Sequence, residues 1–109
     1  MANDALVEYE AIADELTATS PVVRGKTFGM PCLKENGKLF AGFTQGAMVF
    51  KLPQPHHAEA LALRGAHLFD PSGEGHAMKE WVVVPATHAA RWLDFARTAQ
   101  RYVAAGRAK

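Results

Sequence analysis

Apolar residues recur at helical spacing in the first part of the chain, and acidic residues fall on the opposite side. The apolar positions are Leu6, Tyr9, Ile12, Ala13 and Leu16. This amphipathic pattern predicts a helix, which Asn3 or Asp4 can cap and whose acidic first turn suits the positive end of the helix dipole. The pattern is interrupted by the Thr- and Ser-containing stretch that leads to Pro21, so we expect the helix to end before that proline.

From Val22 to Pro53 the pattern changes to the alternation that is typical of β-strands. Asn36-Gly37 favours a two-residue hairpin turn, because both central residues of that turn need positive φ. The turn places Glu35 opposite Lys38, an opposite-charge pair that agrees with the register. A second turn at Gln45-Gly46 divides the segment again, so we expect three antiparallel strands.

The two turns also determine which residues face each other and which face of the sheet they share. They place Leu33 opposite Phe40, Cys32 opposite Ala41, Met30 opposite Phe43, Phe43 opposite Met48 and Ala41 opposite Phe50. On this register one face is apolar and forms the predicted core: Phe28, Met30, Cys32, Leu39, Ala41, Phe43, Met48, Phe50 and Leu52. The other face carries charged residues, as the water-facing side of an antiparallel sheet does.

Three apolar residues, Leu33, Phe40 and Val49, fall among the charges of that second face. An adjacent group of this kind marks an interface when it is exposed, and it is ordinary core when another element of the chain covers it. The pattern leaves both interpretations open. A register shift of one residue would exchange the two faces.

The second half of the chain predicts a helix, two strands and a final helix. The predicted elements are a helix over 56–64, strands over 67–69 and 78–84, and a helix over 88–105. Pro55 suits the start of the first of these helices and Gly65 its end. The order α-β(3)-α-β(2)-α predicts an α+β fold with helices packed on a mainly antiparallel sheet. We expect residues 105–109 to form a frayed tail.

The length, charge and cysteine content narrow the function further. The 109 residues correspond to one domain, which we assign to 1–109, and the formal net charge is only +1. Without a dominant basic stripe, nucleic-acid binding is not favoured. The chain has no apolar run of membrane-spanning length and no signal-peptide pattern at its start. One cysteine, Cys32, cannot form an internal disulfide, which fits a reducing cytoplasm.

We find no pattern of an active site, a cofactor site or a metal site. Cys32 is a candidate nucleophile, but its place inside the predicted sheet favours a core role over a reactive thiol. The five histidines lack the spacing of metal ligands, and the glycine-containing segment 73–76 lacks the other residues of a phosphate-binding loop. Two alternatives stay open: thiol chemistry at Cys32, and a small-molecule pocket between the sheet and the last helix, near Trp81 and Trp92.

Two stretches of the chain resemble the amino-terminal domain of the TfoX (Sxy) family. The first is GKTFGMPCL (25–33) followed by NGKLFAG (36–42), and the second is MKEWVVVP (78–85) followed by a Trp-bearing helix. The resemblance covers 6–103 and implies a two-layer α-β(3)-α-β(2)-α fold related to secretion-chaperone-like domains, with no catalytic residues to carry over. The family's namesakes regulate natural competence together with a cyclic-AMP-responsive transcription factor, and they carry a second, helical domain that the resemblance does not include.

Together these inferences predict a cytoplasmic, non-enzymatic regulatory or interaction module that acts through protein–protein contacts. We expect self-association as a homodimer, with Leu33, Phe40 and Val49 at the interface, and an unidentified protein partner is a further option. A role related to transcription is implied by the resemblance alone. The alternative function is binding of a small molecule in a pocket between the sheet and the last helix.

Overall fold

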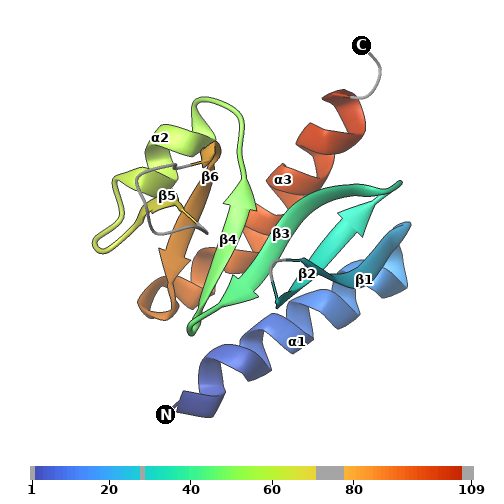
Figure 1. Cartoon of the computed structure of the whole chain (residues 1–109), viewed down its shortest axis with the longest axis horizontal. Coiled ribbons are helices and arrows are strands. Elements are labelled where there is room, and N and C mark those ends of the chain that lie inside the picture. Colours follow the sequence, from blue (N-terminus) through green and yellow to red (C-terminus); the bar gives the residue numbers. More distant parts are fainter. Residues whose placement is uncertain (1, 28, 71–77, 107–109) are drawn as a thin grey trace.

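The structure is a computed structural model that describes residues 2–27, 29–70 and 78–106. Its elements are α1 (Ala2–Thr19), β1 (Val22–Thr27), β2 (Met30–Glu35), β3 (Lys38–Thr44), β4 (Ala47–Lys51), α2 (His56–Leu61), β5 (His67–Phe69), β6 (Met78–Pro85), the 3₁₀ helix η1 (Ala86–Arg91) and α3 (Trp92–Gly106). The six strands form one antiparallel sheet in the order β1-β2-β3-β4-β6-β5 (Figure 1). The predicted α+β class is therefore confirmed.

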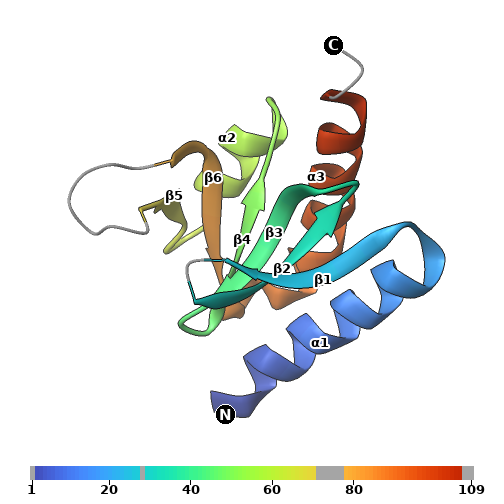
Figure 2. The ribbon, with the colours of Figure 1, turned by 45° about the vertical axis from the view of Figure 1, so that its right-hand side comes forward.

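The α-helices pack on one face of the sheet, where α1 lies along β1 and α3 crosses β3 and β4 (Figures 1 and 2). Phe43 in β3 stacks on Tyr9 of α1 with ring centroids 5.3 Å apart, and it meets Trp92 of α3 edge-on at 6.4 Å. The Trp92 indole N–H donates to the Val84 carbonyl at 3.1 Å. Both long helices are thus anchored on the same side chain of the sheet.

A second apolar cluster lies on the opposite face of the sheet, which no described helix covers and which we name the helix-free face. Its buried members are Met30, Ala47, Val49, Phe69, Trp81 and Val83. Alternation along the strands places every second residue there. The sheet therefore separates two apolar layers, of which only one is shared with the helices.

The predicted first helix is confirmed as α1. Tyr9, Ile12, Ala13 and Leu16 are buried against the sheet. Leu6 is the exception, because it lies at the margin of the apolar stripe and is 42% exposed. The helix ends at Thr19, before Pro21, as the sequence indicated.

The prediction of three strands before Pro53 is wrong by one strand. Gly29 adopts a φ of 77°, which is open to glycine at little cost, and the chain reverses there. The residues before it form β1, which pairs with β2 from Val22–Glu35 to Thr27–Met30. Phe28, which we assigned to the core, lies outside the described residues. The element order is therefore α-β(4)-α-β(2)-α.

The hairpin at Asn36-Gly37 is confirmed, and so is the pairing of Glu35 with Lys38. Between Lys34 and Leu33 the register shifts by one residue, because β3 contains a bulge. Lys34 still lies opposite Leu39, but Leu33 lies opposite Ala41 and Cys32 opposite Gly42. Phe40 is thus the extra, unpaired residue of the bulge. The second hairpin follows the prediction, with Phe43 opposite Met48 and Ala41 opposite Phe50.

The bulge reverses the predicted faces of β2 while it leaves those of β4 unchanged. Leu33 and Phe40, which we placed on the charged face, belong to the core under the helices. Met30, which we placed in that core, lies in the cluster of the helix-free face, and Leu39 packs against it. Because side chains alternate with a period of two, an odd number of extra residues exchanges the two faces.

The later elements differ from the prediction mainly at their ends. The predicted helix over 56–64 ends earlier, at Leu61, and the predicted strand over 78–84 extends to Pro85. The predicted helix over 88–105 is divided, because η1 precedes α3 and His88 has non-helical φ and ψ of −110° and 25°. Of the predicted frayed tail, Ala105 and Gly106 are still helical, and the rest lies outside the described residues.

None of the described helices combines the length and the apolar character that crossing a bilayer requires.

Replacement of Phe40 by aspartate is expected to unfold the protein rather than to alter a surface. The Phe40 side chain is 0% exposed, so Phe40→Asp removes a buried ring and leaves an unpaired carboxylate in the core. We expect the free energy of unfolding to fall by more than about 3 kcal/mol in urea denaturation. The control is Val7→Asp at a site that is 61% exposed, and equal stability of the two variants would contradict the assignment.

The burial of Tyr9 predicts that the protein loses stability at alkaline pH. Burial, aided by the nearby Cys32 and only partly offset by Arg24, raises the pKa of Tyr9 from 10.0 to about 12. The unfolded chain then releases this proton first, so stability falls as the pH rises from 10 towards 12. At pH 11 the wild type should lose about 1 kcal/mol relative to pH 9, whereas Tyr9→Phe should lose correspondingly less. Identical pH profiles of the two proteins in urea denaturation would refute this role of Tyr9.

Candidate functional site

The three residues predicted to form an exposed interface are all buried within the chain. Leu33 and Phe40 belong to the core between the sheet and the helices, and Val49 belongs to the cluster on the helix-free face. Each is 0% exposed. The bulge in β3 is the cause, since it turns Leu33 and Phe40 towards the helices. These residues therefore do not form a common surface, and the interpretation that other elements cover them is the correct one for Leu33 and Phe40.

Cys32 is buried, and its environment favours the neutral thiol. It lies between Gly25 of β1 and Gly42 of β3, and a Cβ atom placed on Gly25 would be 3.6 Å from its Sγ. Burial raises the pKa of the Cys32 thiol, an effect that the charge of Lys34 only partly offsets. Because the thiolate is the reactive form, this site does not favour thiol chemistry.

Two of the described histidines contact backbone carbonyls of distant segments. His57 Nε2 lies 2.7 Å from the Lys79 carbonyl, and His88 Nε2 lies 2.9 Å from the Arg64 carbonyl. Within the described ranges, no three His, Cys, Asp or Glu residues come together as a metal site would require. The segment 73–76, with His76, lies outside those ranges.

The pocket predicted between the sheet and the last helix is not formed by the two tryptophans. Trp92 is buried in the core under the helices, whereas Trp81 lies in the cluster on the helix-free face. The sheet separates them, because Trp81 alternates with Val82 and Val84, which point towards the helices. A hollow that the described residues form lies instead on the helix-free face, near the β3–β4 turn and β5, and has a volume of about 510 Å³.

The first strand carries features that the sequence interpretation missed. β1 is an edge strand of six residues. Besides its ladder with β2, the described chain gives it one backbone hydrogen bond, from the Val22 N–H to the Ser20 carbonyl at 2.8 Å. In an antiparallel ladder every second residue directs its N–H and C=O away from the neighbouring strand. The outer side of β1 therefore presents backbone donors and acceptors to another strand.

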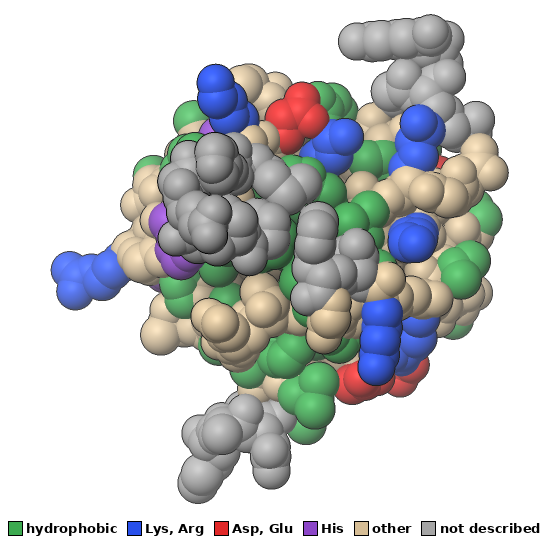
Figure 3. All heavy atoms as spheres, viewed as in Figure 1, with side chains coloured by type: hydrophobic (Ala, Val, Ile, Leu, Met, Phe, Trp, Pro, Cys, Tyr) green, Lys and Arg blue, Asp and Glu red, His purple; other side chains and the backbone are tan. Residues whose placement is uncertain are grey.

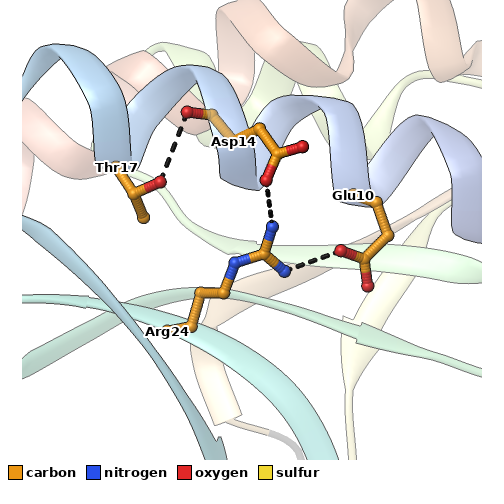
Figure 4. A network of polar contacts seen from close by, with 4 residues as sticks. All are labelled: Glu10, Asp14, Thr17 and Arg24. Atoms are coloured by element: carbon orange, nitrogen blue, oxygen red, sulfur yellow. Dashed lines mark hydrogen bonds and ion pairs between the residues drawn. The ribbon is translucent and has the colours of Figure 1, made fainter.

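Arg24 ties β1 to α1 (Figure 4). Its guanidinium donates to Glu10 Oε1 at 2.7 Å and to Asp14 Oδ1 at 2.5 Å, and the Thr17 hydroxyl donates to the Asp14 carbonyl at 3.3 Å. The hydrogen bond to Glu10, together with that to Asp14 and despite some desolvation, raises the pKa of Arg24. We name Glu10, Asp14 and Arg24 the edge triad, and its formal charge is −1, one guanidinium against two carboxylates.

The edge triad is solvent-accessible, with side-chain exposures of 39% for Arg24, 49% for Glu10 and 76% for Asp14. Ion pairs of this kind contribute little stability. The edge triad therefore presents a net charge of −1 at the surface. The sequence contains a signal for the edge triad. Glu10 and Asp14 stand four residues apart on one helix face, where two acidic side chains repel each other unless a cation lies near.

Lys26 is a further charged residue of β1, outside the edge triad. Because Val22 is buried towards the helices and Arg24 reaches α1, alternation places Lys26 on the same side of β1. Lys26 is exposed, and within the described part of the chain it forms no ion pair. On the other side of the strand, Val23 is 62% exposed. Figure 3 shows Lys and Arg side chains over the part of the surface that carries β1, β2 and β3.

Comparison of the chain with protein-family models, with curated proteins and with solved structures gave no match. The resemblance to the TfoX family therefore stays a prediction from the residues.

The buried, protonated state of Cys32 predicts an unreactive thiol. In the native protein, modification by Ellman's reagent should be at least about 100-fold slower than in urea, because the reagent reaches Sγ only when the sheet opens. The measurement is the absorbance change at equal reagent concentration in both conditions. Rapid stoichiometric modification of the folded protein would instead restore the hypothesis of a redox or thiol function.

Proposed function

We propose that this protein is a non-enzymatic interaction module that forms a homodimer by pairing β1 with β1 of a second copy. The observation that carries the proposal is the outer edge of β1, which has six residues in unbroken register with β2 and no described strand beyond it. Such an edge is a template for another strand. The resemblance to the TfoX family adds a regulatory, transcription-related role in the cytoplasm and a secretion-chaperone-like layering as parts of the same proposal.

The other edge of the sheet is poorly suited to pairing. β5 has only three residues, and its register with β6 shifts between Leu68 and Phe69. Short and irregular edges are a common protection against unwanted strand addition. Of the two edges, β1 is therefore the one that can bind an added strand over several hydrogen bonds.

Symmetry restricts the way in which two copies of β1 can pair. A twofold axis perpendicular to the sheet keeps the helices of both copies on the same side, and directly opposed residues must then share a face. With the axis at Gly25, Arg24 lies opposite the partner's Lys26, and Val23 lies opposite the partner's Thr27. This register keeps the centre of the contact free of side chains.

Arg24 and the partner's Lys26 are like charges placed directly opposite each other in this register, and the carboxylates of Glu10 and Asp14 beside Arg24 compensate for the repulsion. The partner's Lys26 would approach the edge triad, whose two carboxylates outweigh the guanidinium of Arg24, and the symmetry repeats the contact. A charge of +1 thus meets a charge of −1 twice. On the opposite side of the strand, pairing would cover part of the exposed Val23 side chain. The contact is small, so it corresponds to a weak dimer with a dissociation constant on the order of micromolar.

Reversal of the charge at Lys26 is expected to weaken the dimer at least about tenfold, because two attractive contacts of about 0.5–1 kcal/mol each become repulsive. Sedimentation velocity over a concentration series measures the effect in Lys26→Glu. The matched control is Lys79→Glu, an exposed lysine of β6, four strands away from β1. A monomeric wild type up to about 100 µM, or equal weakening in both variants, would refute the proposal.

The register can be tested in the same dimer by cross-linking. Opposed Cα atoms of antiparallel strands lie about 4.5–5.5 Å apart, within the range of a disulfide. In a Cys32→Ala background, which prevents a bond between neighbouring strands, Gly25→Cys should yield an oxidised dimer and Val23→Cys should not. Efficient cross-linking through residue 23 would show that a different register is formed.

A further inference from the structure

The hairpin at Asn36-Gly37 determines which backbone groups of β1 point out of the sheet. A two-residue turn is closed by a hydrogen-bonded pair, so the N–H and C=O of Glu35 point towards β3. The backbone groups of a strand alternate in direction. Pro31 follows this alternation, because its carbonyl oxygen lies 3.2 Å from the position that a Cβ atom on Gly42 of β3 would take. The even-numbered residues of β2 are therefore the ones that bond to β1.

Arg24 and Lys26 direct their backbone groups away from the sheet. Val22 is paired with Glu35, whose own groups point to β3, so the Val22 N–H is free to donate outside the ladder, to the Ser20 carbonyl at 2.8 Å. Arg24 and Lys26 follow Val22 by two and four residues and have the same orientation. Within the described chain, no backbone hydrogen bond outside the ladder uses their N–H or C=O groups. These two residues therefore offer donors and acceptors to an added strand.

The helix-free side of β1 favours apolar side chains on an added strand. Val23 lies on that side and is 62% exposed. The next residue on the same side is Gly25, which leaves the space beside Val23 free of side-chain atoms of β1. An apolar side chain opposite Gly25 would reach Val23, which lies diagonally from it, and a second one would lie directly opposite Val23. Pairing with such a strand would cover the exposed valine on two sides.

The helix side of β1 favours an acidic side chain at one position. Lys26 is exposed and forms no ion pair within the described part of the chain. An opposite charge directly across from it is a stabilising cross-strand pair. Arg24 is already bonded within the edge triad, so an uncharged polar residue suits the position opposite it. Read from its amino end, the complementary antiparallel strand has the pattern acidic, apolar, polar, apolar.

We propose that β1 binds an extended segment of another protein that has this pattern and lies antiparallel to β1. The segment would exchange backbone hydrogen bonds with Arg24 and Lys26 and place its acidic residue opposite Lys26. The inference rests on the same edge as the proposed dimer. Because a second copy and the segment need the same backbone groups, they exclude each other. The dimer is therefore the form in which the edge is blocked, and binding of the segment separates the two copies.

Two fluorescein-labelled peptides, TEITIT and TKITIT, test the pattern, because they differ only in the charge placed opposite Lys26. Fluorescence anisotropy over a titration with the full chain measures the affinity. We expect TEITIT to bind at least about fivefold more tightly than TKITIT, and we expect Lys26→Glu to reverse this preference. The control Lys79→Glu, at an exposed position of β6, should keep the preference of the wild type. Absence of saturable TEITIT binding up to about 1 mM, or the same preference in Lys26→Glu, would overturn the proposal.

Amide hydrogen exchange locates the bound peptide. At saturating TEITIT the amides of Arg24 and Lys26 should exchange at least about threefold more slowly, whereas those of Val23 and Gly25, which are bonded to β2, should change little. Binding without slower exchange at Arg24 and Lys26 would show that the peptide lies elsewhere and would overturn the proposal.

Sedimentation velocity distinguishes this inference from the proposed dimer. A wild type that dimerises and becomes monomeric when TEITIT is added supports both. A monomeric wild type that binds TEITIT with the expected charge preference refutes the dimer but supports the segment site. A dimer that persists at saturating TEITIT overturns the inference and leaves the dimer intact.

Discussion

The fold of this protein depends on one unpaired residue in the middle of its sheet. Phe40 interrupts the ladder between β2 and β3, and from that point every side chain of β2 lies on the opposite face from the one a regular hairpin would give it. Leu33 and Phe40 thereby enter the layer that receives Tyr9 and Trp92 from the two long helices. Without the shift, Cys32 and Met30 would occupy that layer. The helices would then meet smaller and more flexible side chains.

The same shift requires a close approach on the other face. Met30 lies across Gly42, and a Cβ atom on this glycine would come within 2.8 Å of Met30 Cε and 3.2 Å of the Pro31 carbonyl oxygen. A residue with a side chain would have to push both away. Gly42 and the bulge therefore depend on each other. The bulge moves Met30 to the helix-free face, and Gly42 leaves the space that Met30 needs where β2 and β3 come together.

Local chemistry made much of the architecture predictable. The Asn36-Gly37 turn, the Glu35–Lys38 pair and the second hairpin follow from residues that are close in sequence. Neither the fourth strand nor the bulge has a comparable signal, because Gly29 is one glycine among several and Phe40 fits either face by its chemistry. Packing against α1 and α3, which are distant in the sequence, decides on which face of the sheet Phe40 lies. The hollow near the β3–β4 turn and β5 is likewise not predictable from the sequence, since residues of β2, β3, β4, β5 and β6 line it.

The unequal edges of the sheet have a consequence for the size of any assembly built on it. One edge is long and regular, and the other has three residues and a shifted register. A sheet of this kind can be extended once, by joining two long edges, and the product has only short, irregular edges left. The sheet therefore cannot be extended beyond two copies, because the remaining edges are too short and irregular to pair, and no further element is needed to cap it. A strand arrangement that invites pairing is in this way kept from propagating into a fibre.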